Sequence, residues 1–272
     1  MTDFSFATAQ LAGGRVQCDR AFVGGDYVVV LDGASPHRPV PVSVPSYVDC
    51  LGEAITSRLD AGTGQELSTT LAEAIAETRD RLNLVTHDSP SSTVAMARIG
   101  TDTVDFLVLG DSLITHPTGN LIDLRLDDVA IAERRRYSDR LNHGYGYDSI
   151  HKELLHELQN AQVRHRNTDG GYWIAEAEPH AANHALTLTI ARNDVSWFII
   201  STDGAYESLE QLRRDNWEQL SHLDSLSLGQ LLQDCHDVEA ADPDGRRWPR
   251  AKIHDDKTIV VARRLDPAVA RV

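Results

Sequence analysis

The sequence has few cysteines, few aromatic residues and no long apolar run. Its three cysteines, Cys18, Cys50 and Cys235, are odd in number and widely separated, which excludes a disulfide framework and a zinc knuckle. A reducing cytoplasm is therefore the expected location. No stretch approaches the roughly 20 apolar residues that span a bilayer, and the N-terminus lacks the pattern of an export signal. We therefore expect no membrane partner.

Positive charge is also scarce. Acidic residues outnumber basic ones 41 to 26, which gives a net charge of -15. Such a surface repels a phosphate backbone, so a nucleic-acid partner is not expected. The hydrophobic fraction of 41% and the charged fraction of 25% are those of a soluble globular protein. A chain of 272 residues can bury a large core in one domain or in two smaller ones.

Six apolar runs rich in β-branched residues predict strands. They are Tyr27–Leu31, Thr93–Ile99, Val104–Leu109, Ala185–Ile190, Val195–Ile200 and Thr258–Ala262. Short turns separate the second run from the third and the fourth from the fifth. This spacing predicts two antiparallel hairpins rather than strand–helix–strand crossovers.

Five segments with helical spacing of apolar residues lie between these strands. They are Ser46–Leu59, Glu66–Leu82, Val129–Asp139, Ser149–His165 and Leu226–Glu239. Strand pairs grouped with helix pairs predict an α+β fold, in which a central antiparallel β-sandwich is flanked by α-helices. We expect residues 1–272 to form a single domain.

An aspartate stands at the end of three of the predicted strands. These are Asp32 in VVVLDGAS, Asp203 in WFIISTDGAYE and Asp255 in HDDKTIVVAR. Any one of them is more often a turn or capping residue. Three carboxylates at converging strand ends would repel one another, so a cation that neutralises them explains the repetition best. Oxygen ligands without histidine or cysteine favour Mg2+ or Mn2+.

The order and context of these motifs resemble the metal-dependent Ser/Thr protein phosphatases of the 2C type. The similarity covers nearly the whole chain, through CDRAFV, LDGAS, SSTVAMARI, VLGDSLI, FIISTDG and HDDKTIVV. It implies a four-layer α-β-β-α fold and an enzyme that hydrolyses phosphoserine or phosphothreonine in a protein substrate. It also implies that two Mn2+ or Mg2+ ions are bound, or three if a third site is present, and that a bridging water is the nucleophile.

The resemblance also implies roles for single residues. Asp32 resembles the metal-bridging aspartate, Gly33 the residue that offers its carbonyl oxygen, and Asp203 and Asp255 the remaining ligands. Asp111 in VLGDSLI matches an aspartate that helps to hold a third metal in bacterial members.

Three further positions complete the implied site. Asp19 resembles the acidic residue that orients metal-bound water. Arg15 is the candidate for binding phosphate, with Arg20 as second choice, although a surface role is common for either arginine. His37 and His254 are the histidines nearest to the site in sequence, and a structural role is the more common one for a lone histidine. Residues at about 120–183 correspond to the family's flap.

Some positions depart from the family pattern. Cys18 precedes Asp19 where many members have a glutamate, and Leu113 stands where bacterial relatives often have an arginine. Two alternatives therefore stay open: a small-molecule phosphomonoesterase, and a catalytically impaired phosphatase-like module that binds or regulates. The oligomeric state is not determined by the sequence, and a monomer is expected.

Overall fold

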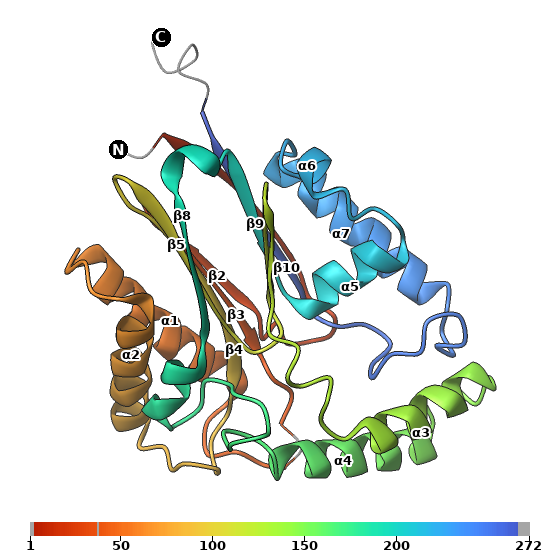
Figure 1. Ribbon diagram of the computed structural model, residues 1–272. Helices are drawn as coiled ribbons and strands as arrows, with labels where there is room; N and C mark the ends of the chain where they lie inside the picture. Colours follow the sequence, from red (N-terminus) through yellow and green to blue (C-terminus); the bar gives the residue numbers. More distant parts are fainter. Residues whose placement is uncertain (1–2, 37, 266–272) are drawn as a thin grey trace.

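Two five-stranded antiparallel sheets form the centre of the molecule (Figure 1). The computed structural model describes residues 3–36 and 38–265. The first sheet has, in spatial order, β1 (Phe4–Leu11), β10 (Lys257–Arg264), β9 (Trp197–Ser201), β6 (Leu113–His116) and β7 (Gly119–Leu121). The second has β2 (Arg20–Val23), β3 (Tyr27–Gly33), β4 (Ser92–Ile99), β5 (Thr103–Leu109) and β8 (Leu186–Ala191).

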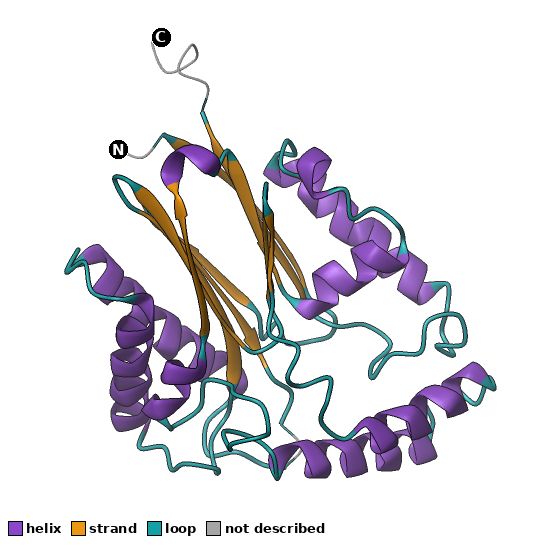
Figure 2. Cartoon of the chain, in the orientation of Figure 1, coloured by secondary structure: helices purple, strands orange, loops and turns teal. Residues whose placement is uncertain are grey.

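Helices cover the outer face of each sheet (Figure 2). The second sheet carries α1 (Val44–Asp60) and α2 (Leu67–Leu82), and the first carries α5 (Asp203–Gln211), α6 (Trp217–Leu220) and α7 (Ser225–Ala240). Two short 3-10 helices, η1 (Pro179–His184) and η2 (Arg192–Asp194), flank β8. The predicted α+β sandwich with flanking helices is confirmed.

The period of two along the strands explains the layers. In β3, Val29 and Leu31 pack under α1 and α2, whereas Val28 and Val30 pack against the other sheet. Both faces of this strand are buried, so it reads as an unbroken apolar run. The strands β9 and β10 alternate in the same way between the middle of the sandwich and the helices α5 and α7.

The second predicted hairpin is wrong. The strand β8 pairs with β5 in the second sheet, whereas β9 pairs with β10 and β6 in the first. The short helix η2 carries the chain across the edge of the sandwich between them (Figure 1). A five-residue connection has the length of a hairpin loop, and nothing local distinguishes a turn within one sheet from a connection between two sheets.

A helical hairpin lies at one end of the sandwich, next to the ends of the central strands (Figure 1). It is formed by α3 (Ile131–Asn142) and α4 (Ser149–Val163), which pack through Tyr137, Leu141 and Leu158. None of the described helices is both long and apolar enough to cross a bilayer.

Candidate metal centre

The structure brings five of the predicted site residues to one cavity. Asp32 and Gly33 end β3, Asp111 follows β5, Asp203 begins α5 directly after β9, and Asp255 precedes β10. All five line a cavity of about 460 Å3 between the sandwich and the helices α3 and α4. The ends of strands from both sheets therefore meet where the sequence predicts a metal site.

Asp19 is not among the residues that line this cavity and is almost fully buried, with 1% of its surface exposed. Thr202 donates a hydrogen bond through Oγ1 to Asp19 Oδ2 at 2.9 Å, and Thr258 donates its backbone N–H to Thr202 Oγ1 at 3.0 Å. Asp19 Oδ1 is buried and has no hydrogen-bond partner among the described residues. A buried carboxylate oxygen without a hydrogen-bond donor is costly, so we expect a water or a cation beside it.

The electrostatics of the cluster point to a cation. Burial raises the pKa of Asp32 well above its usual range, and the carboxylates of Asp19, Asp203 and Asp255 raise it further. Burial likewise raises the pKa of Asp19 to about 7, although hydrogen bonds from Thr202 and Thr258 oppose the shift. Each ionised carboxylate in this cluster therefore carries an electrostatic cost that a bound cation would offset. An all-oxygen donor set with this excess of negative charge fits Mg2+ or Mn2+.

Two acidic residues that sequence analysis missed, Glu207 and Asp127, line the same cavity. Burial and the charges of Asp203, Asp111 and Asp127 raise the pKa of Glu207 to about 8. Burial, followed by the charge of Asp203, raises that of Asp111 to about 7. Glu207 stands four residues after Asp203 on α5, so the two share one helix face. That spacing in DGAYE was the available signal, whereas Asp127 lies in a loop and gave none.

Close backbone approach explains the glycines next to two of the aspartates. A Cβ at Gly33 would lie 2.4 Å from Val44 Cγ1 and 2.8 Å from the Cys18 carbonyl oxygen. A Cβ at Gly204 would lie 2.1 Å from the Asp256 carbonyl oxygen. Neither position has room for a side chain, so glycine lets the loops around the cluster pack together.

Comparison with known proteins identifies the family. The family model of protein phosphatase 2C matches residues 17–233, which is more than half of the chain. The chain belongs to the protein phosphatase 2C family. It is thus a metal-dependent Ser/Thr phosphatase, as the motifs indicated. No curated protein is similar enough in sequence to count as a match.

Solved structures share the fold of this phosphatase at low sequence identity. The catalytic domain of the serine/threonine protein phosphatase PstP, in complex with two manganese ions, is 11% identical, with a TM-score of 0.53 over 97% of this chain and 99% of that chain. PppA, a regulatory component of the T6SS in Pseudomonas aeruginosa, is 17% identical, with a TM-score of 0.53 over 96% and 97%. Stp1 from Staphylococcus aureus is 12% identical, with a TM-score of 0.54 over 97% and 95%. At these identities the likeness shows the fold alone.

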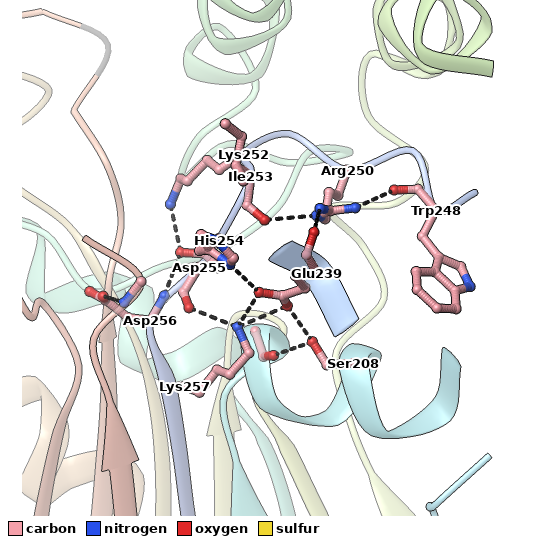
Figure 3. A network of polar contacts seen from close by, with 12 residues as sticks. Ser208, Glu239, Trp248, Arg250, Lys252, Ile253, His254, Asp255, Asp256 and Lys257 are labelled. Atoms are coloured by element: carbon pink, nitrogen blue, oxygen red, sulfur yellow. Dashed lines mark hydrogen bonds and ion pairs between the residues drawn. The ribbon is translucent and has the colours of Figure 1, made fainter. Parts of the chain in front are cut away.

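A buried network anchors the Asp255 loop of this phosphatase (Figure 3). Glu239 on α7 accepts hydrogen bonds at 2.8 Å from Ser208 Oγ and Lys257 Nζ. His254 Nδ1 lies 2.9 Å from Glu239 Oε2, and Lys257 Nζ also donates to the Asp255 carbonyl oxygen at 3.0 Å. The Lys257 side chain is fully buried. Glu239 therefore ties α5, which carries Asp203, to the loop that carries Asp255.

The same network contains a second group of metal-ligating side chains. Ligand atoms of His236, Glu239 and His254 lie within 4.8 Å of one another. The two imidazole rings are stacked, however, with centroids 3.8 Å apart and planes 15° apart. Stacked rings direct their nitrogen lone pairs side by side rather than toward one point, and Lys257 already neutralises Glu239. We therefore interpret this group as a structural support.

The remaining candidates do not line the cavity, or lie outside the described residues. Arg15 is exposed and does not line the cavity. Arg20 binds Asp49 through Nε at 2.6 Å. His254 contacts Glu239 through Nδ1, which agrees with the structural role that is common for a lone histidine. His37 lies outside the described residues.

Proposed function

We propose that this phosphatase removes the phosphoryl group from phosphoserine or phosphothreonine in proteins, using two Mn2+ or Mg2+ ions. The proposal assigns the ions to Asp32, the Gly33 carbonyl oxygen, Asp203 and Asp255. Asp111 would contribute to a third. The observation that carries it is the convergence of Asp32, Asp111, Asp203 and Asp255 on one cavity in a chain of this family.

The surroundings of each residue indicate its role in this reaction. When bound, two such ions lower the pKa of a water and neutralise the charge that develops on the phosphoryl oxygens. Asp32 is buried, and the charges of Asp19, Asp203 and Asp255 act on it, so a cation beside it would relieve this repulsion. Asp19 Oδ1 accepts no hydrogen bond from the part of the chain that the structure describes, which suits it to accept one from a water. The phosphate-binding role of Arg15 stays a prediction.

Several wider features belong to the same proposal. Residues 1–272 would act as one domain, with about 120–183 as a flap over the cavity, in agreement with the lining provided by α3 and α4. Three free cysteines suit a cytoplasmic location. We expect a monomer without nucleic-acid or membrane partners.

The two alternatives are not favoured. The matched family is one of protein phosphatases, which speaks against a small-molecule phosphomonoesterase. Asp32, Asp203 and Asp255 are all present and come together, which speaks against an impaired module.

The test compares hydrolysis of a phosphoserine peptide and of an aryl phosphate with Mn2+ and then with EDTA. Asp32→Ala and Asp203→Ala should each lower kcat by at least about 100-fold, because each removes a ligand from the proposed site. The matched control is Asp215→Ala, since Asp215 is exposed and outside the cavity lining. Activity that survives EDTA, or both cavity substitutions, would refute the metal-dependent mechanism.

A further inference from the structure

Among the described residues, four cationic side chains line the cavity, and three of them are paired with carboxylates outside the proposed ligand set. The four are Arg134, Arg166, Arg250 and Lys252. The three arginines pair, in that order, with Asp127, Glu176 and Asp242, at 2.7, 3.9 and 3.0 Å. Lys252 alone among these four pairs with a proposed metal ligand.

Lys252 Nζ lies 2.7 Å from Asp255 Oδ1, in an ion pair in which both side chains are partly exposed (Figure 3). Lys252 also lines the same cavity as Asp32 and Asp203, so its ammonium faces the space that the proposed metal centre would occupy.

This position places two cations in competition for one carboxylate. A divalent ion on Asp255 would face the ammonium across a few Å, where like charges repel strongly. The lysine has a flexible four-carbon stem and 40% of its side chain is exposed, so it can move away from Asp255 within the cavity. The anion that enters this cavity during catalysis is the phosphoryl group of the substrate. A lysine ammonium binds phosphate well as a point charge.

The predicted phosphate ligand is not at the cavity wall, because Arg15 is exposed and lies outside the lining. We propose that Lys252 binds the substrate phosphoryl group, and that in the metal-free protein the same ammonium is the counterion of Asp255. This inference rests on the proposed function for the identity of its anion. It gives one side chain two alternating partners, the carboxylate before metal binding and the phosphate after it.

The two roles predict opposite effects of one substitution. In Lys252→Met, Mn2+ should bind about two- to fivefold more tightly, because a competing cation of the strength of an exposed ion pair is gone. Inorganic phosphate should bind the Mn2+-loaded protein at least about tenfold more weakly, because a charge-assisted hydrogen bond is lost. Lys252→Arg should retain phosphate binding. A merely structural lysine would not produce this tighter metal binding together with weaker phosphate binding.

Titration calorimetry on the full chain measures both affinities, first with Mn2+ and then with inorganic phosphate at saturating Mn2+. Lys152→Met is the matched control, because Lys152 is exposed on α4 and does not line the cavity. Unchanged phosphate affinity in Lys252→Met, or weaker Mn2+ binding, would overturn the inference. Phosphate binding is measured without turnover, so it tests Lys252 even if the wild type fails to hydrolyse a phosphopeptide, a result that would refute the proposed function instead.

Discussion

Asp19→Asn should stabilise the metal-free phosphatase while weakening its hold on metal. Asp19 is 1% exposed, and only one of its carboxylate oxygens accepts a hydrogen bond from the described residues. An asparagine has the same shape, can still accept the hydrogen bond from Thr202, and carries no charge. The substitution therefore removes the cost of an ionised carboxylate in a buried acidic cluster.

The size of the effect follows from the pKa. Burial raises the pKa of Asp19 from 3.8 to about 7, which at 1.36 kcal/mol for each pKa unit corresponds to about 4 kcal/mol. The native state binds this proton more tightly than the unfolded state does, so the free energy of unfolding falls as pH rises from about 4 to about 7. The stabilisation by Asp19→Asn should be about 4 kcal/mol at pH 8 and about 2 kcal/mol at pH 5.

Urea denaturation followed by tryptophan fluorescence measures this difference. Both proteins are unfolded at pH 5 and pH 8 in EDTA, and again at pH 8 with Mn2+. In Mn2+ the advantage of the variant should shrink or reverse, because loss of a carboxylate that supports the metal shell costs about 10- to 100-fold in metal affinity.

The control is the same chemical change at Asp256. The two carboxylate oxygens of Asp256 accept hydrogen bonds from the backbone N–H groups of Gly13 and Cys18, both at 2.7 Å. In Asp256→Asn the side-chain NH2 group would therefore face one of these N–H donors. Asp256→Asn should destabilise the protein by about 1–3 kcal/mol in EDTA. If Asp19→Asn fails to stabilise the EDTA-treated protein at pH 8, or if its effect does not grow with pH, the electrostatic account of the site is wrong.

Three further outcomes are expected. Gly204→Ala should lower the free energy of unfolding by about 1–3 kcal/mol and weaken Mn2+ binding in calorimetry, because its Cβ would lie 2.1 Å from the Asp256 carbonyl oxygen. Glu239→Gln should cost about 3–5 kcal/mol in urea denaturation, because it leaves the fully buried Lys257 without a charged partner; a change below 1 kcal/mol would contradict this. Mn2+ affinity should rise between pH 6 and pH 8 with release of protons, because Asp111, with a pKa of about 7, must ionise to bind; equal heats in buffers of different ionisation enthalpy would argue against it.

Local pattern was enough to predict much of this protein. Strands buried on both faces read as unbroken apolar runs, so β3, β4, β5, β9 and β10 were found within a few residues of their bounds. The helices α1, α2, α3, α4 and α7 followed from apolar spacing. The aspartates at strand ends were visible because a strand end and its polar residue are adjacent in the chain. The short or less apolar elements β1, β2, β6, β7 and α5 were missed, since they lack a long enough pattern.

Long-range packing decided the rest. A five-residue link cannot show whether β8 and β9 share a sheet, because pairing depends on which distant strands offer free edges. The role of Glu239 likewise follows from contacts across the fold, because this residue of α7 meets Ser208 of α5 and Lys257 of β10. The sequence alone could therefore name the carboxylates that a metal needs. Only the folded chain shows which other charges surround them, because those charges come from separate segments, among them Arg134 on α3, Glu207 on α5 and Glu239 on α7.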